Sequence, residues 1–146
     1  IPRQLGDLGA LQYLSLGNNK LDGHIPPQLG QLRVLQHLSL PNNELDGRIP
    51  PELGKLAALE KLSLGRNQLS GPIPEELGKL TAVKELHLNG TSSQVRFRRP
   101  IPKELGKLTA LETLYLNGNN LSGHIPPQPE NLSALKHLSL YSNKLD

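Results

Sequence analysis

Two short segments place a histidine and a serine two residues apart, a pairing that could serve nucleophilic catalysis. They are His37-Leu38-Ser39 and His137-Leu138-Ser139. Each lies where apolar and polar residues alternate, which predicts a strand. Residues i and i+2 of a strand are about 6.6 Å apart, beyond hydrogen-bond reach for side chains that stand upright on a sheet. No acidic residue or oxyanion hole accompanies either pair, so the sequence does not predict an enzyme.

Two glycine-lysine segments resemble a phosphate-binding loop only superficially. They read Gly78-Lys79-Leu80-Thr81 and Gly106-Lys107-Leu108-Thr109. A phosphate-binding loop needs Ser or Thr directly after Gly-Lys, and it needs a glycine-rich stretch before it. His24 and His124 would lie too far apart in a stack of repeats to share a metal ion, and there is no cysteine. The sequence therefore predicts neither a cofactor nor a metal.

Residues 91–102, TSSQVRFRRPIP, place three arginines around the only phenylalanine of the chain. Arginine binds carboxylate and phosphate groups through paired hydrogen bonds, and phenylalanine can anchor an apolar contact. Partner-binding residues are therefore predicted at Arg96, Phe97, Arg98 and Arg99. In the alternative interpretation the segment is a tolerated insertion, with Val95 or Phe97 packed inward and the arginines solvated. A net charge of +3 and one basic loop do not favour nucleic acid as the partner.

These candidate residues belong to a chain that repeats one pattern. Ile-Pro recurs every 24 residues, except for a step of 28 residues from Ile73 to Ile101. The copies start at Ile1, Ile25, Ile49, Ile73, Ile101 and Ile125. We therefore predict a single domain, 1–146, of about six repeats, with a four-residue insertion in the fourth repeat within 91–100. The chain opens with IPRQLG and ends with NKLD, both in mid-repeat, so we expect an uncapped part of a longer protein.

The repeat unit reads LxxLxLxxNxLxGxIPxxLGxL, and each part predicts a local structure. In LxL, alternation predicts a short strand with leucine inward and the polar residue outward. The recurrent asparagine lies at a turn, where its side chain can bond backbone groups, and stacked repeats would form a buried asparagine ladder. Leu29, Leu32 and Leu35 are three residues apart, which suits a 3₁₀ turn. One unit cannot bury its leucines alone, whereas stacked units share a continuous core.

The copies LQYLSLGNNKLDGHIPPQLGQL and LEKLSLGRNQLSGPIPEELGKL resemble the leucine-rich repeat family, and GxIPxxLGxL is similar to its plant-type class. The resemblance covers nearly the whole chain. It implies a right-handed α/β solenoid with a parallel sheet on the concave face and short 3₁₀ turns on the convex side. It also implies an extra short strand after each first strand, and a role in binding. The segments LGKLTAL and LSGPIPEELG are also similar to repeats from brown algae, which occur in ROCO-type GTPases and in receptor-like proteins.

Outward positions of the predicted strands are free of packing constraints, so their residue types indicate function. All three tyrosines fall on these positions, at Tyr13, Tyr115 and Tyr141. Tyr115 lies beside His87 in its row, and His137 shares the last repeat with Tyr141. We therefore predict that His87, Tyr115, His137 and Tyr141 bind a partner on the C-terminal half of the concave face. In the alternative, tyrosine and histidine are there because they suit strands.

The strand faces also carry charged residues and possible sites of modification. Lys61 and Glu85 are neighbours in one row and are expected to pair. Three Asn-x-Ser/Thr sequences, at Asn89, Asn120 and Asn131, are possible glycosylation sites if the protein is secreted. A glycan on Asn89 would obstruct the proposed binding face.

The sequence thus predicts a non-enzymatic module that recognises a protein or peptide within a larger signalling or defence protein. It would use the concave face and the arginine-rich loop. The alternatives are a regulatory or scaffolding arm of a ROCO-type GTPase and a purely structural spacer. No apolar run approaches the ~20 residues of a membrane helix. We expect an extracellular or cell-surface location if the parent is receptor-like, and a cytoplasmic one if it is of ROCO type.

Overall fold

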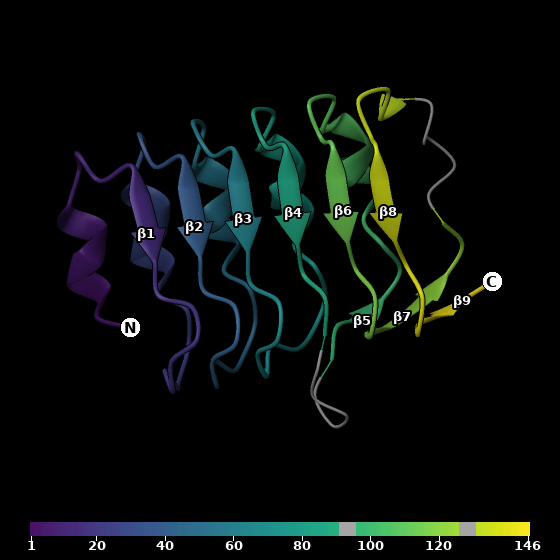
Figure 1. The fold of residues 1–146 in the computed structure, drawn as a ribbon, viewed down its shortest axis with the longest axis horizontal. Coiled ribbons are helices and arrows are strands. Elements are labelled where there is room, and N and C mark those ends of the chain that lie inside the picture. Colours follow the sequence, from purple (N-terminus) through teal and green to yellow (C-terminus); the bar gives the residue numbers. More distant parts are fainter. Residues whose placement is uncertain (91–95, 126–130) are drawn as a thin grey trace.

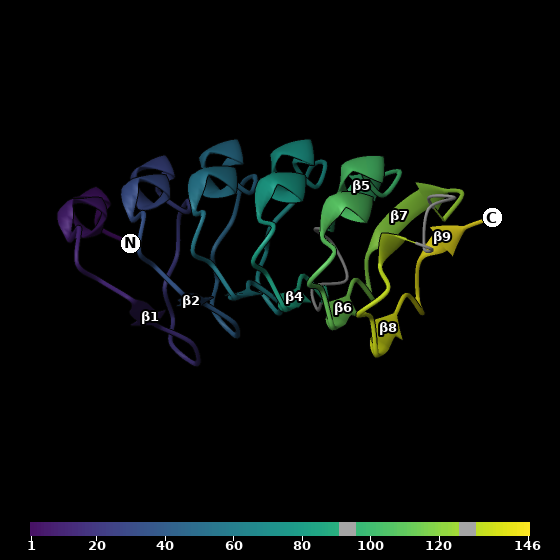
Figure 2. The ribbon, with the colours of Figure 1, turned by 90° about the horizontal axis from the view of Figure 1, so that it is seen from above.

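The computed structural model describes residues 1–90, 96–125 and 131–146. In these ranges each repeat turns once, through a strand, a bend and a 3₁₀ helix, and successive turns stack side by side (Figure 1). Viewed from above, the strands lie on the inner side of a gently curved stack and the 3₁₀ helices lie on the outer side (Figure 2). The predicted solenoid is confirmed.

The inner side is a six-stranded parallel sheet in the order β1-β2-β3-β4-β6-β8. Its strands are β1 (Tyr13–Ser15), β2 (His37–Ser39), β3 (Lys61–Ser63), β4 (Glu85–His87), β6 (Thr113–Tyr115) and β8 (His137–Ser139). Equivalent residues of consecutive repeats lie side by side, because the central leucines pair in register from Leu14 to Leu138. The central leucines of β1, β2, β3, β4 and β6, such as the fully buried Leu38, belong to the core, whereas Leu138 of the last strand is 51% exposed.

The outer side consists of 3₁₀ helices that follow the first five Ile-Pro segments. They are η1 (Arg3–Asp7), η2 (Pro27–Gln31), η3 (Pro51–Lys55), η4 (Glu75–Lys79) and η5 (Lys103–Lys107). The proline before each helix is extended, as in Pro50 at φ −64° and ψ 128°, which ends the straight segment and starts the turn. Leu29, Leu32 and Leu35 are fully buried, so the three-residue spacing places each leucine against the core.

A second, smaller sheet forms the flank between the two sides. It consists of β5 (Arg98–Arg99), β7 (Asn120–Gly123) and β9 (Lys144–Leu145), in that order. The earlier repeats have only the isolated bridges His24–Asp46 and Gly71–Phe97 in this place. The extra strand that the family resemblance implies for every repeat is therefore present as a strand in the C-terminal repeats of the described chain.

The predicted asparagine ladder is present and bonds consecutive repeats. Asn67 donates from Nδ2 to Leu40 O at 2.9 Å and to Leu64 O at 3.0 Å, and its Oδ1 accepts from Leu45 N at 3.1 Å. Asn43 and Asn119 are buried in the same role. The ladder thus satisfies backbone groups that the bend after each inner strand leaves without a sheet partner.

Candidate functional site

The centre of the candidate site is a stacked pair of rings on the inner sheet. In-register pairing of β4 and β6 places His87 directly beside Tyr115. Their ring centroids are 4.8 Å apart and their planes differ by 20°. Both side chains are half-buried, so the pair presents a partly apolar surface to a ligand.

Charged groups surround the histidine of this pair. Lys61 Nζ lies 2.7 Å from Glu85 Oε2, which confirms the predicted cross-strand pair, and the same carboxylate oxygen lies 3.6 Å from His87 Nε2. Lys61 lowers the pKa of Glu85, mainly by a hydrogen bond. Burial lowers the pKa of His87, against the opposing charge of Glu85. The imidazole is therefore held in its neutral form near pH 7.

His87 Nε2 is buried and has no hydrogen-bond partner among the residues that the structure describes. Buried ring nitrogens in folded proteins are normally paired, because an unpaired polar group in a dry place is costly. His87 Nε2 can accept one hydrogen bond from a ligand group, or donate one to it.

Further ion pairs form a row along one edge of the inner sheet. Lys84 Nζ lies 2.8 Å from Glu60 Oε2, and Lys136 Nζ lies 2.7 Å from Glu112 Oε2. Each lysine lowers the pKa of its glutamate, chiefly by hydrogen bonding. These exposed pairs are explained by cross-repeat pairing alone and need no ligand.

The other two residues predicted on this face lie apart from the stacked rings. His137 is exposed on β8, and the side chain of Tyr141, with 69% of its surface accessible, follows that strand. Within the described residues neither ring contacts the His87–Tyr115 pair. They extend the same face by one repeat, but they do not form one cluster with it.

A second ring pair lies at the N-terminal end of the same sheet, outside the C-terminal half on which the sequence predicts partner binding. Tyr13 and His37 contact edge to face with centroids 4.8 Å apart. The Tyr13 hydroxyl donates to Gln36 Oε1 at 2.9 Å, and 57% of the tyrosine is exposed. The sequence could have predicted this pair, because Tyr13 and His37 occupy the same outward position of adjacent repeats.

The prediction that Phe97 is an exposed anchor is wrong. Its side chain is 4% exposed and belongs to the hydrophobic core. Its backbone N–H reaches Asn119 Oδ1 at 3.4 Å, as Leu45 N reaches Asn67 Oδ1, so Phe97 occupies the place of the leucine in N-x-L. The alternative, in which one apolar residue of the insertion packs inward, is confirmed for Phe97. Val95 lies outside the described residues.

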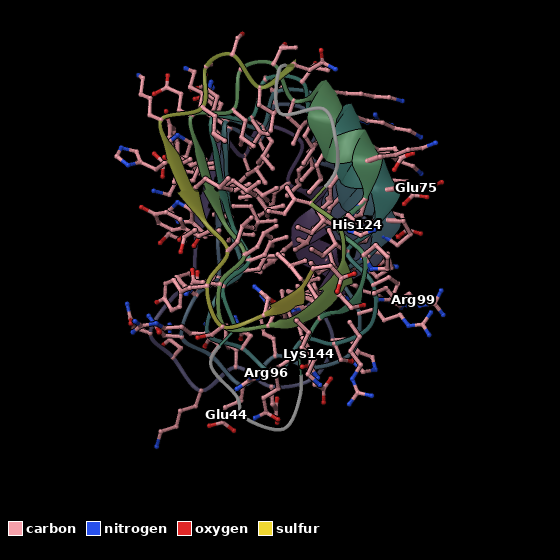
Figure 3. The ribbon with its side chains drawn as sticks, turned by 90° about the vertical axis from the view of Figure 1, so that its right-hand side faces the viewer. Glu44, Glu75, Arg96, Arg99, His124 and Lys144 are labelled. Carbon is pink, nitrogen blue, oxygen red and sulfur yellow. The ribbon has the colours of Figure 1, made fainter. Side chains whose placement is uncertain are left out.

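The arginines do not join the concave face either. Arg98 and Arg99 are exposed in β5, which belongs to the flank sheet. Arg99 projects on the side of the 3₁₀ helices, opposite the inner strands, and Arg96 lies at the lower edge (Figure 3). The physical reason is the position of Phe97, because the chain rejoins the repeat there and carries the next residues to the flank. The predicted single site therefore divides into two surfaces.

The three Asn-x-Ser/Thr sequences lie in different environments. Asn89 is half-buried after β4, Asn120 is half-buried in β7 and Asn131 is exposed. Their glycosylation stays a prediction. Within the described residues no group of three or more His, Asp or Glu side chains is arranged to hold a metal ion. None of the helices described here is both long and apolar enough to cross a membrane.

Comparison with protein families gives two matches. A model described as leucine-rich repeat region matches residues 1–99, and one described as leucine rich repeat matches residues 110–132. No curated protein sequence matches significantly.

Solved structures of plant receptors are similar over the whole chain. The plant peptide hormone receptor RGFR1, in complex with RGF2, is 37% identical with a TM-score of 0.94, over 99% of this chain and 23% of that chain. A TDR receptor is 38% identical with a TM-score of 0.94, over 99% and 24%. The ectodomain of the Arabidopsis receptor kinase HAESA, in complex with an extended IDA peptide hormone, is 36% identical with a TM-score of 0.93, over 99% and 24%. The chain thus spans about a quarter of the length of these structures.

Proposed function

The chain belongs to the leucine-rich repeat family, and on that premise we propose that it recognises a peptide on its concave face without catalysing a reaction. The peptide lies across the inner strands and is centred on the His87–Tyr115 stack. The observation that carries the proposal is that stack, in which His87 Nε2 has no hydrogen-bond partner among the described residues.

The chemistry of this face suits an extended peptide. Stacked rings offer a flat surface of low conformational entropy to an apolar or aromatic side chain. The His87 nitrogen offers one directional hydrogen bond, for which a peptide carbonyl or amide is a natural partner. The Lys61–Glu85 pair next to it can exchange its partner for a charged group of the ligand. Together these groups would bind one apolar side chain of the peptide and the polar groups beside it.

Similarity to receptors that bind peptides supports recognition rather than the other two roles. RGFR1 is a plant peptide hormone receptor solved in complex with RGF2, HAESA was solved in complex with an IDA peptide hormone, and this chain is more than a third identical to each. A peptide-recognition role implies an extracellular domain of a signalling receptor. In that case Asn89, Asn120 and Asn131 become candidate glycosylation sites. A repeat arm of a GTPase, or a spacer, has no need of a stacked ring pair on the inner sheet.

The proposal is tested with a random peptide library displayed on phage and selected against the 146-residue chain. Peptides that bind are then titrated against Tyr115→Ala and against Tyr13→Ala, the matched control at the other end of the sheet. Loss of a buried aromatic contact costs about 2 kcal/mol, or roughly thirtyfold in affinity. We expect that loss in Tyr115→Ala and little change in Tyr13→Ala. A library that yields no binder supports the spacer, and binders that Tyr115→Ala leaves unaffected place the site elsewhere.

A further inference from the structure

A trough of about 460 Å³ lies on the outer flank, between the third and fifth Ile-Pro segments. Its floor is formed mainly by isoleucines and prolines of these segments, and charged side chains line its two lips. Arg48 and Arg99 come just before the third and fifth Ile-Pro segments, and we call them the cationic lip; Glu75, Glu76 and Glu104 follow the fourth and fifth Ile-Pro segments at the starts of η4 and η5, and we call them the anionic lip. This surface is separate from the concave face, because Glu75 and Arg99 both project from the helix side of the stack (Figure 3).

Arg99 stands where the other repeats have a glycine. Gly23, Gly47, Gly71 and Gly123 have φ angles between 70° and 82°, and Arg99 adopts the same left-handed conformation at φ 86°. Only glycine takes this conformation without a steric penalty. A non-glycine residue with this backbone strain indicates that its side chain has a compensating role, such as binding. Its long, exposed guanidinium side chain at the lip of a trough is the evident candidate for that gain.

Arg48 forms the other end of the same lip. A Cβ atom on Gly71 would lie 3.1 Å from Arg48 Cγ, so the absence of a side chain at residue 71 leaves room for the arginine stem. Arg48 thus packs against the backbone of Gly71. In the described part of the chain, neither guanidinium forms an ion pair.

The anionic lip is equally unpaired. In the described ranges Glu75, Glu76 and Glu104 make no ion pair, although other glutamates of this chain do. A polyanion such as nucleic acid would be repelled by three carboxylates, and a simple cation would be repelled by two guanidinium groups. The order across the trough is cationic, apolar and anionic. A complementary ligand therefore carries an acid, an apolar group and a base in that order.

We propose that this trough is a second interaction surface, which docks an extended segment of a partner protein. An acidic side chain of the segment pairs with Arg48 and Arg99, an apolar side chain lies on the proline floor, and a basic side chain pairs with the glutamates. Paired hydrogen bonds from arginine give the acidic end its specificity. The surface is independent of the peptide site on the inner sheet, because the two lie on opposite sides of the core.

The test uses a synthetic array of octapeptides. Each contains one aspartate, one leucine and one lysine among alanines, in every order and spacing. Bound peptides are titrated against the 146-residue chain by amide NMR shifts. The variants are Arg48→Gln and Arg99→Gly, with Arg3→Gln as the matched control, since Arg3 is exposed in η1 at the far end of the stack. Arg99→Gly restores the residue that suits the backbone, so lost binding in this variant is not caused by unfolding.

We expect peptides with the Asp-Leu-Lys order at one spacing to bind, and each trough variant to weaken them at least tenfold while Arg3→Gln does not. Peptides with the reversed order should bind more weakly to the wild-type chain. The proposal is overturned if no octapeptide shifts the flank amides at millimolar concentration. It is also overturned if binding survives both trough variants, or depends on Tyr115 instead of Arg99.

Discussion

Replacement of Asn67 by alanine tests whether the asparagine ladder stabilises the stack. Asn67 lies between the second and third turns, is 6% exposed, and bonds both of them. Its Nδ2 donates to the carbonyls of Leu40 and Leu64, and its Oδ1 accepts from the N–H of Leu45. Its Nδ2 also lies 3.4 Å from Gly65 O, a carbonyl that keeps the N–H of Asn42 as a partner. Alanine removes all four bonds without a steric clash, so the measured loss reports the bonds themselves.

The expected loss of unfolding free energy depends on which backbone groups keep another hydrogen-bond partner after Asn67 is replaced. The Leu40 carbonyl still accepts from Asn43 Nδ2 at 3.2 Å. Within the described residues, the Leu45 N–H and the Leu64 carbonyl have no other hydrogen-bond partner. An unsatisfied buried polar group costs about 1–3 kcal/mol. Two such groups give an expected loss of about 2–6 kcal/mol, a large share of the stability of an ordinary domain.

The control is Asn19→Ala at the exposed end of the ladder. Asn19 Nδ2 donates to Leu16 O and Gly17 O, both at 3.1 Å and both in exposed surroundings. Water can replace these bonds, so we expect a loss of about 0.5–1.5 kcal/mol. Both variants are measured by urea unfolding at constant pH, with the slope checked against the wild type. Equal losses in the two variants would refute the ladder as a source of stability.

Three further substitutions test the burial of Phe97, the close packing of consecutive repeats at Gly54, and the burial of His87. Phe97→Ala should cost about 3–5 kcal/mol in urea unfolding, because the ring fills the core, and a cost below about 1 kcal/mol would mean that it is exposed. Gly54→Ala places a Cβ atom 2.4 Å from a backbone oxygen of the next repeat and should cost about 1–3 kcal/mol, whereas Gly9→Ala meets nothing within 4 Å and should be neutral. Burial lowers the pKa of His87 below 6.5, so the unfolded chain binds the proton first; stability is complete above pH 6.5 and declines as the pH falls below it. Thermal unfolding across that range should lose this part of its pH dependence in His87→Gln.

Most of the scaffold could be predicted from the sequence, because its rules act within one repeat. Leucine alternation fixes the strand, Ile-Pro fixes the extended segment, and a three-residue spacing of leucines fixes the 3₁₀ turn. The pairing of Lys61 with Glu85 followed as well, since one register relates all repeats. These features depend on local sequence and on the in-register stacking of repeats of nearly equal length.

The position of the arginines could not be predicted in the same way. The four extra residues can lie before or after the segment RFRR. The repeat pattern that follows the fourth strand fits both positions, so it does not fix the place of the arginines. Counting backward from Ile101 would have placed Phe97 on the leucine of N-x-L and Arg99 on the glycine. The structure selects that frame because Phe97 fills the core and its N–H meets Asn119. Burial of one large ring therefore decided where the charges lie.

The contacts between repeats explain why such a scaffold can carry two independent surfaces. Asn43, Asn67, Asn119 and Asn143 each bond two neighbouring turns, and Gly54 of the 3₁₀ helix η3 packs directly on a backbone carbonyl of the next repeat. The backbone spacing is thus fixed by groups that no ligand touches. The backbone that carries the outward side chains of the inner sheet and of the flank is thus in place before binding, which lowers the conformational cost of binding at each surface. Under that condition a substitution on one surface leaves affinity at the other unchanged, which is why Tyr115 and Arg99 can be tested separately.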